Sequence, residues 1–492
     1  MRAATIEALV CPYTGGPLRL AEGAIGDGDR IEFGLVRSES FDFPIVGGVL
    51  LLGLGKGYGG HEEGLAPYVP IQAAAIEHLG RGDVEGLLRW LRRHAPLVHR
   101  LMIDGYADYA EFALDLHTRG LRLESAALAA DADYGVLGDV GVRRRLRQLL
   151  PDPAAAWAHR RVAGVRAWRS SARAARHPEA VLDSSFYAQR FYSPRAAATA
   201  LQVAHLPIGD RVLSLCGGHG MFENILEQSG RLPGQLVCVD GQLVNLLAVS
   251  RFVTPEADPI CLDVQLTLPF RDGWFDGVFS STCLPEIPAQ AHFLREAIRV
   301  TGTHGWTLFD SLWALDSGVL RCDPYRSYRY LQNFLPDTAS YRALLTRCAG
   351  TRAVAYSVSG APAEQLRGAR WAVGEDEIDA ELADPADTEL NALVVDRAGF
   401  GGFVTADHSW MPDRLVPSPA YRPGDHGQLR RRDVFAELSP VFASLDFPGL
   451  PAQAELPGAG PVARWAELYA AGVMAALPRR YRTADSGLLA PA

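Results

Sequence analysis

The sequence lacks a surplus of positive charge. Its 48 basic residues are outnumbered by 57 acidic residues, which gives a formal net charge of -9. A surface of this sign repels a phosphate backbone unless one face is locally basic, so we do not expect nucleic acid as a partner. Lys56 is the only lysine, and no function follows from this bias toward arginine.

Cysteines are few, and their spacing matches no metal or disulfide framework. Seven are scattered at positions 11, 216, 238, 261, 283, 322 and 348, without a CxxC pair. An odd number with this spacing signals neither a disulfide framework nor a zinc cluster. Those at 216, 238, 261 and 283 fall on or beside predicted strands, where a free cysteine packs as a small apolar residue. We expect a reducing compartment and no bound metal.

Long apolar runs are also missing. No stretch is long enough to span a bilayer, and residues 1–20 lack the basic, apolar and small-residue regions of a signal peptide. The expectation is a cytoplasmic protein without a membrane partner.

Four regions differ in composition and periodicity, within the range of about two to four folded units that the chain length suggests. Residues 1–58 predict a small β-rich module. Residues 59–205 carry Ala, Leu and Arg at helical spacing and predict a helical lid or oligomerisation region. Apolar strands alternate with amphipathic stretches from 206 to 410, which predicts βαβ units and a parallel sheet. Residues 411–492 form a proline-rich C-terminal extension.

A glycine-rich turn follows the first strand of that parallel sheet. In LSLCGGHGMFENIL, residues 213–226, an apolar run precedes three glycines within four residues, and a segment of helical spacing follows. Glycine removes the Cβ that would block a ligand, and the start of the helix offers unpaired N–H groups. By itself, such a turn is equally typical of plain strand-to-helix packing.

Carboxylates at the ends of the next two strands favour a ligand-binding turn over plain strand-to-helix packing. QLVCVDG closes its strand with Asp240, about 20 residues after the turn, where an acidic side chain in this kind of sheet accepts hydrogen bonds from ribose hydroxyls. PICLDV ends at Asp263, on the same edge of the sheet and within reach of an adenine amino group. Three such features at consecutive strand ends predict a site for an adenosyl group.

These motifs resemble those of class I S-adenosylmethionine-dependent methyltransferases. The resemblance covers residues 195–310 and rests on RVLSLCGGHG, VCVDG, CLDVQLTLPFRDGWFDGVFSS and HFLREAIRVTGTHGWTLFD. It implies an α/β fold with a Rossmann-like, seven-stranded methyltransferase domain and S-adenosyl-L-methionine as the cofactor. It also implies that the glycine turn faces the methionine part, that Asp240 binds the ribose and that Asp263 lies near the adenine. The implied cofactor-binding residues are Ser214, Cys216, Gly217, Gly218, Gly220, Asp240, Gly241, Asp263, Val264 and Ser281.

Two positions depart from the family pattern. The family commonly has an acidic residue where Ser214 stands and a glycine where Cys216 stands. The cofactor's ammonium group therefore loses a usual partner, and the turn gains a side chain. Two other readings stay open: an enzyme that uses the same cofactor for aminocarboxypropyl transfer, cyclisation or a lyase reaction, and a catalytically inactive partner protein.

The N-terminal region resembles a second family. LVCPYTGGPLRL followed by FPIVGGVLLL is similar to the small zinc-ribbon-type domain that accompanies many RNA and quinone methyltransferases, over residues 6–53. That pattern would place a second cysteine where Thr14 stands. One thiol cannot hold a zinc ion that needs four ligands, so we expect a degenerate module without metal.

Candidate catalytic residues lie at the carboxyl edge of the sheet. Methyl transfer from a sulfonium depends on alignment and exclusion of water, and only some acceptors, such as a hydroxyl, need a base. The candidates are His219 in the glycine turn, Glu286 after the fourth strand and Asp310 after the fifth. Each is also compatible with a structural role.

Aromatic residues in SSFYAQRFYSPRAA precede the first strand of the parallel sheet. Tyr187, Phe191 and Tyr192 lie where the family folds a helical lid over the cofactor, and they could stack on adenine or shield the sulfonium. Their helical spacing fits core packing equally well. The predicted function is methyl transfer to a small-molecule acceptor in specialised metabolism, with a homodimer as one option for assembly.

Overall fold

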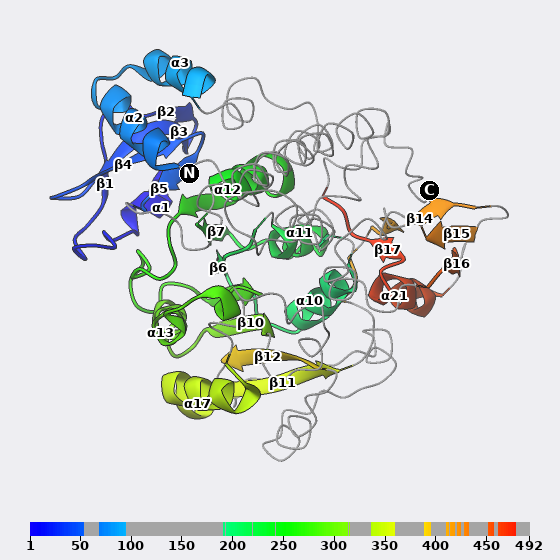
Figure 1. Ribbon diagram of the computed structural model, residues 1–492. Coiled ribbons are helices and arrows are strands. Elements are labelled where there is room, and N and C mark those ends of the chain that lie inside the picture. Colours follow the sequence, from blue (N-terminus) through cyan, green and yellow to red (C-terminus); the bar gives the residue numbers. More distant parts are fainter. Residues whose placement is uncertain are drawn as a thin grey trace, which may run out of the picture.

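Twelve strands form one continuous sheet at the centre of the structure (Figure 1). The sheet runs in the order β1-β3-β4-β5-β8-β7-β6-β9-β10-β12-β11, and β2 pairs with β3. The segment from β8 to β11 has seven strands and confirms the expected α/β, Rossmann-like fold. The computed structural model describes residues 1–53, 68–94, 190–191, 193–218, 220–241, 243–312, 314, 336–359, 388–394, 410–412, 414–418, 421–424, 428–431, 451–456 and 461–478.

The strands are short at the N-terminal edge and longer in the centre. Their bounds are β1 Arg19–Leu20, β2 Ile25–Asp27, β3 Arg30–Arg37, β4 Asp42–Val46, β5 Val49–Leu51, β6 Arg211–Leu215, β7 Gln235–Asp240, β8 Asp258–Cys261, β9 Gly277–Ser281, β10 Trp306–Leu312, β11 Ala353–Ser359 and β12 Thr388–Val394. The central strands β8, β9 and β10 are buried along their whole length. Strands covered on both faces need apolar side chains in both directions, which explains their unbroken apolar runs.

Alternate side chains of the central strands enter two separate hydrophobic clusters. Val212 and Cys238 point into the cluster on one face of the sheet, whereas Leu213 and Val237 point into the cluster on the opposite face. This alternation is the period of two expected of a strand. Each face therefore has its own layer of helices.

Helices cover both faces of the sheet. The first cluster takes side chains from α2 (Tyr68–Gly80), α3 (Val84–His94), α10 (Pro194–Ala204), α11 (Met221–Gln228) and α12 (Leu243–Ala248). The second takes them from α1 (Ala3–Glu7), α13 (Gln290–Thr301) and α17 (Thr338–Ala349). A π-helical turn, η2 (Val249–Val253), extends α12. No helix in the described part of the chain has both the length and the apolar character that crossing a membrane requires.

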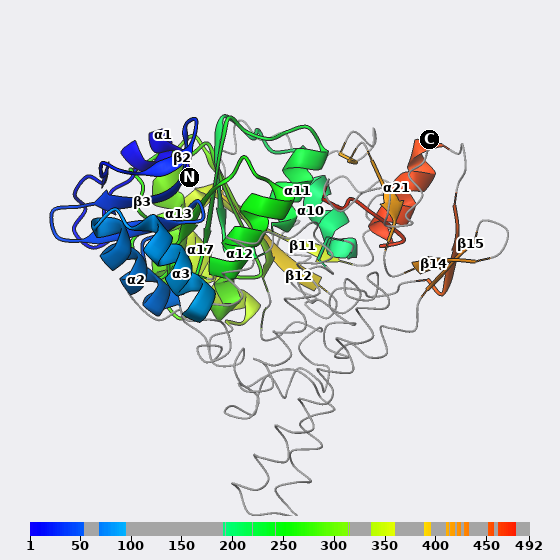
Figure 2. The ribbon, with the colours of Figure 1, turned by 90° about the horizontal axis from the view of Figure 1, so that it is seen from above.

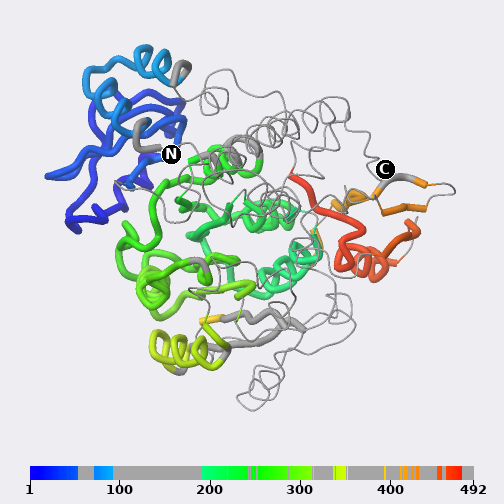
Figure 3. The backbone as a smooth tube through the Cα atoms, viewed as in Figure 1, coloured from blue at the N-terminus to red at the C-terminus, as the bar shows by residue number. Residues whose placement is uncertain are grey.

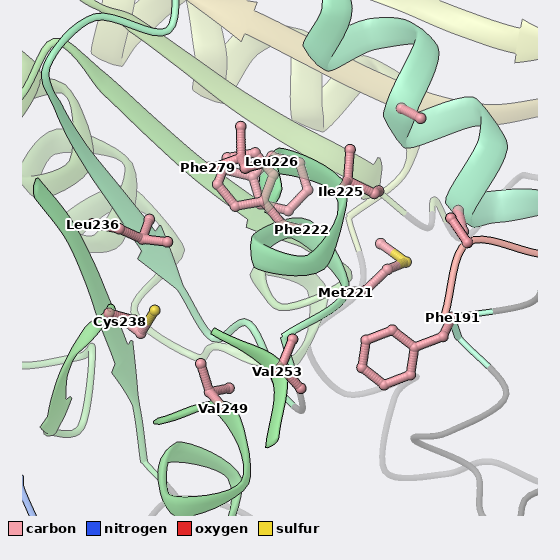
Figure 4. Packing of buried hydrophobic residues seen from close by; sticks show 14 of the residues in the cluster. Phe191, Met221, Phe222, Ile225, Leu226, Leu236, Cys238, Val249, Val253 and Phe279 are labelled. Atoms are coloured by element: carbon pink, nitrogen blue, oxygen red, sulfur yellow. The ribbon is translucent and has the colours of Figure 1, made fainter. Parts of the chain in front are cut away.

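Helix α11 packs directly on the centre of the sheet. All eight of its residues are buried, and the Phe222 ring stacks on Phe279 of β9 with centroids 4.0 Å apart (Figure 4). Met221 and Phe191 lie in the same cluster. The glycine turn that precedes α11 is thus attached to a rigid element.

The N-terminal strands are part of the methyltransferase-like sheet and do not form a sheet of their own. β5 pairs in parallel with β8, through Leu50 with Ile260 and Leu51 with Cys261. Figure 3 shows this N-terminal segment, in blue, running alongside the central strands in green. Within the expected helical region 59–205, α2 packs on β3 and β4, and α3 packs on α2. Most of that region lies outside the described residues.

A buried carboxylate fastens the N-terminal module to β8. The side chain of Asp258 is fully buried. Its Oδ1 accepts the backbone N–H of Arg2 at 2.8 Å, and its Oδ2 accepts Arg2 Nε at 2.8 Å and the Thr5 hydroxyl at 2.5 Å. These contacts join residues more than 250 positions apart in the chain.

The turn that resembles a zinc ribbon contains a single thiol. Cys11 is buried, its N–H donates to Gly16 O at 2.7 Å, and its carbonyl accepts the Gly15 N–H at 2.8 Å. No group of three or more His, Cys, Asp or Glu side chains that could hold a metal occurs in the residues that the structure describes. Backbone hydrogen bonds hold this turn.

The C-terminal segment packs on α10 and α11. It contains α21 (Val462–Ala470) and the strand pair β13 (Val416–Pro417) with β17 (Met474–Ala475). Asn224 of α11 donates to Ala476 O at 2.7 Å, and Trp410 stacks on Tyr469 with centroids 6.0 Å apart. A three-stranded sheet, β14 (Tyr421–Pro423), β15 (Gln428–Arg431) and β16 (Gln453–Glu455), completes it. Figure 2 shows this segment at the end of the molecule opposite α2 and α3.

Two of the sequence motifs are joined by an ion-pair network. Glu296 accepts the Leu268 N–H at 2.8 Å and pairs with Arg299 at 2.7 Å. Arg299 also donates to Phe270 O at 2.7 Å and to Asp272 at 2.8 Å. Burial raises the pKa of Glu296, but the hydrogen bonds from Arg299 and from the Leu268 N–H outweigh it, so the pKa is lowered. The LPFRD and EAIRV motifs therefore hold each other in place.

Replacement of Asp258 by Ala should destabilise the whole chain. The change removes the carboxylate that pairs with the mostly buried Arg2 guanidinium. We therefore expect a loss of about 3 to 5 kcal/mol in the free energy of unfolding. Urea denaturation followed by circular dichroism measures it. Glu467→Ala removes an exposed pair with Arg464 and should cost less than about 1 kcal/mol. Equal losses for the two variants would contradict the role given to Asp258.

Candidate functional site

The carboxyl ends of five parallel strands meet at one edge of the sheet. β8 pairs with β7, β7 with β6, β6 with β9, and β9 with β10, each in parallel. Cys216, Asp240, Ser281 and Asp310 therefore lie at or just beyond strand ends on the same side. The strand order reverses between β6 and β9, and ligands of such sheets bind in the crevice at that point.

The glycine turn and the carboxylate of β7 contact each other. The Gly218 N–H donates to Asp240 Oδ2 at 3.1 Å, and Asn245 Nδ2 donates to Oδ1 at 3.4 Å. Gly218 and Gly220 have φ of 57° and 92°, a region that side chains rarely adopt. Gly220 then begins α11 as its N-terminal cap. Two features predicted from separate motifs are thus brought together.

Three residues other than glycine also have a positive φ. Among the described residues, the positive φ values outside glycine belong to Cys216 at 56°, Thr282 at 57° and Ser311 at 56°. All three lie at the ends of β6, β9 and β10, around the same edge. Backbone strain of this kind concentrates where a site holds its groups in fixed positions.

The next three predicted positions, Gly241, Asp263 and Val264, differ in exposure. A Cβ built on Gly241 would meet no atom of the described residues within 4 Å, so among these residues the space beside Asp240 is open. Asp263 Oδ1 accepts the Gln265 N–H at 3.0 Å. The residue is half-buried at the edge of the sheet. The side chain of Val264 is buried in the second hydrophobic cluster. Val264 therefore offers a ligand its backbone alone.

Asp310 is held by three donors. Thr199 and Gln202 of α10 donate to its carboxylate at 3.1 Å and 3.0 Å, and Ser281 of β9 donates at 3.0 Å. The carboxylate is 3% exposed. A carboxylate that accepts from three side chains fixes the orientation of those neighbours. Ser281 faces this network.

Glu223, which the sequence did not single out, lies directly beneath the glycine turn. It is fully buried in the first turn of α11, and Cys238 Sγ donates to its Oε1 at 3.1 Å. A Cβ on Gly217 would lie 2.8 Å from both Glu223 Oε1 and Ser214 Oγ. Neither Ser214 Oγ nor Glu223 Oε2 has a hydrogen-bond partner of good geometry among the described residues.

Burial raises the pKa of Glu223. Its own backbone N–H and the side chains of Ser214 and Cys238 oppose this rise without cancelling it. An acid with a raised pKa is a frequent property of functional sites. One sequence signal pointed to it: helical spacing puts position 223 on a buried face together with Phe222 and Leu226.

The expectation that no disulfide forms is wrong for one pair. Cys216 and Cys283 are bonded across the ends of β6 and β9, with Cα atoms 6.1 Å apart. Their separation of 67 residues gave no short-range signal in the sequence. Cys238 and Cys261 are free and buried, as expected for core residues.

Several predicted positions cannot be placed at the site. His219, Tyr187 and Tyr192 lie outside the described residues. Glu286 ends the short helix η3 (Leu284–Glu286), and its side chain is likewise outside them. Phe191 is 2% exposed and belongs to the first hydrophobic cluster. Phe191 is therefore a packing residue in this structure and does not face the crevice as a lid would.

The segment that runs from β6 into β10 matches the sequence model of a protein family. Residues 213–309, about a fifth of the chain, match the family model described as "Methyltransferase domain", which runs from β6 into β10. Curated protein sequences give no match to the chain.

Solved structures similar to the chain include several methyltransferases. The YcgJ protein from Bacillus subtilis is 12% identical, with 41% of this chain and 98% of that chain covered and a TM-score of 0.28. The plantazolicin methyltransferase BpumL, solved with a pentazolic desmethylPZN analogue and SAH, is 15% identical, with 42% and 85% covered and a TM-score of 0.30. The [4+2]-cyclase SpnF is 18% identical, with 40% and 78% covered and a TM-score of 0.27. Because these identities and TM-scores are low, the likeness carries no argument about function. Function must be argued from the site.

Glu223→Gln should stabilise the protein increasingly as the pH rises. Because the folded state raises the pKa of Glu223, its contribution to stability is fully present below the unfolded pKa and is lost as the pH rises toward the folded one. The neutral amide avoids this loss and can donate to Ser214 Oγ. We expect about 1 to 3 kcal/mol greater stability at pH 8, shrinking toward pH 4.5, in urea titrations. Glu85→Gln, at a side chain 88% exposed, should show no such trend, and a pH-independent difference for Glu223→Gln would contradict its titration.

Proposed function

We propose that the edge formed by β6, β7 and β8 binds S-adenosyl-L-methionine and that the protein transfers its methyl group to a small molecule. The observation that carries this proposal is the hydrogen bond from the Gly218 N–H to Asp240 at 3.1 Å. It joins the turn that would face the methionine part to the carboxylate that would bind the ribose. The match of residues 213–309 to a methyltransferase family supports the same reading.

The polar groups at this edge fit the cofactor in kind. Asp240 offers carboxylate oxygens to the two ribose hydroxyls, and the open space at Gly241 admits the sugar. Asp263 offers an acceptor for an adenine amino group. Ser214 and Glu223 are both buried beneath the turn, and burial raises the pKa of Glu223. The Glu223 carboxyl group therefore stands close to the place where the family has an acidic side chain at the position of Ser214.

Bound S-adenosyl-L-methionine supplies an electrophilic methyl group on a sulfonium. The protein's own contribution is to hold the acceptor in line and to exclude water, which can account for much of the acceleration. Asp310 accepts from Thr199, Gln202 and Ser281 and so holds α10 and the end of β9 in place beside this edge. The net charge of -9 favours a small molecule over RNA as that acceptor.

Asp240→Ala should weaken binding of S-adenosylhomocysteine by about 1 to 3 kcal/mol, or about five- to 150-fold in Kd, because charged hydrogen bonds to the ribose are lost. Isothermal titration calorimetry measures it. Asp272→Ala, at a side chain 82% exposed, is the matched control and should bind as the unchanged protein does. Unchanged affinity in Asp240→Ala would place the ribose elsewhere.

The spent cofactor distinguishes methyl transfer from the alternatives. The full chain, incubated with S-adenosyl-L-methionine and a panel of small amines, carboxylates and phenols, should form S-adenosylhomocysteine in step with a methylated acceptor. Liquid chromatography with mass detection measures both. Methylthioadenosine instead would mean that the aminocarboxypropyl arm is transferred, and the absence of any cofactor binding would favour a non-catalytic partner protein.

A further inference from the structure

Cys216 and Cys283 are bonded at the edge of the sheet where the strand order reverses. Cys216 directly follows β6, and Cys283 follows β9 by two residues. These two strands are parallel neighbours, with Leu215 opposite Ser280. The bond therefore crosses from one strand end to the next at the carboxyl edge.

The chain leaves these two strands in opposite directions. α11, which follows β6, packs in the hydrophobic cluster on one face of the sheet, and α13, which follows β9, packs in the cluster on the other. This divergence opens the ligand crevice of doubly wound sheets. The disulfide joins the ends of these two strands, and Cys216 directly precedes the glycine turn.

The environment of this pair differs from that of the free cysteines. Cys216 and Cys283 are half-buried, whereas Cys11, Cys238 and Cys261 are buried. Burial raises the pKa of Cys238 and Cys261, which keeps them as unreactive thiols. Among the described cysteines, the bridging pair is thus the one that combines exposure with a partner at bonding distance.

We propose that Cys216 and Cys283 form a modification site for low-molecular-weight disulfides, and that their bond closes the crevice to the methionine portion of the cofactor. The closing effect rests on the proposed function. One protein thiolate attacks the small disulfide and releases one thiol. The second protein thiolate then displaces the other small thiol from the mixed disulfide. Two protein thiols and one small disulfide become one protein disulfide and two small thiols.

The position of the bond explains why it would exclude the cofactor. Cys216 stands directly before Gly217 and Gly218, with its backbone at φ 56°, and Thr282 beside Cys283 has φ 57°. The bond ties these two segments together directly before the turn. Reduction leaves two separate thiols that can move apart, so the reduced protein is the binding form.

The test uses the full chain, incubated either with dithiothreitol or with glutathione disulfide and then freed of reagent. Peptide mapping by mass spectrometry should find a Cys216–Cys283 cross-link in the oxidised sample alone. Calorimetry with S-adenosylhomocysteine should give a Kd at least about tenfold higher for the oxidised protein. A cross-link through other cysteines, or equal affinity of the two forms, overturns the proposal.

Two variants separate this effect from general oxidation. Cys283→Ser should bind S-adenosylhomocysteine equally after either treatment, whereas Cys348→Ser, at a free and half-buried cysteine, should keep the difference. Oxidation sensitivity that persists in Cys283→Ser contradicts the site. If the reduced protein binds no S-adenosylhomocysteine, the proposed cofactor and the closing effect both fail, while the peptide map still decides whether these two cysteines are the modified pair.

Discussion

Parallel pairing of β6 with β7 on one side and with β9 on the other is the constraint on which the site depends. It brings the ends of strands from distant parts of the sequence to a single edge, and it sends α11 and α13 to opposite faces. The contact between Gly218 and Asp240 is a direct result, since each residue follows or ends one of these paired strands. The polar groups need no long side chains to meet, because the hydrogen-bond register of the sheet has already aligned them.

Polar side chains of this protein divide into those that hold the scaffold and those available to a ligand. Glu296, Arg299 and Asp258 form their hydrogen bonds with other groups of the chain. These bonds hold the scaffold together and need no ligand to account for them. The buried oxygens of Ser214 and Glu223 are different, because burial without a hydrogen bond is costly unless another group supplies it. This contrast, more than any single residue, directs attention to the glycine turn.

Local sequence patterns predicted the parallel sheet, the turn and Asp240 because each depends on short spacing and strand periodicity. The pairing of β5 with β8 was not predictable in this way, since Leu50 and Ile260 are far apart in sequence and neither carries a signal for the other. The disulfide of Cys216 was missed for the same reason. Glu223 was missed because an acid in the first turn of a helix is usually solvated and favoured by the helix dipole, and only packing shows that it is buried.

The addition of the N-terminal strands to β8 also determines where the sheet ends. Without them, β8 would present a row of open N–H and C=O groups to which a strand from another molecule could add. With them, the outer boundary passes to β1 and β2, of two and three residues, which are too short to serve as a template for such addition. The N-terminal module thus disfavours strand addition at this edge of the sheet.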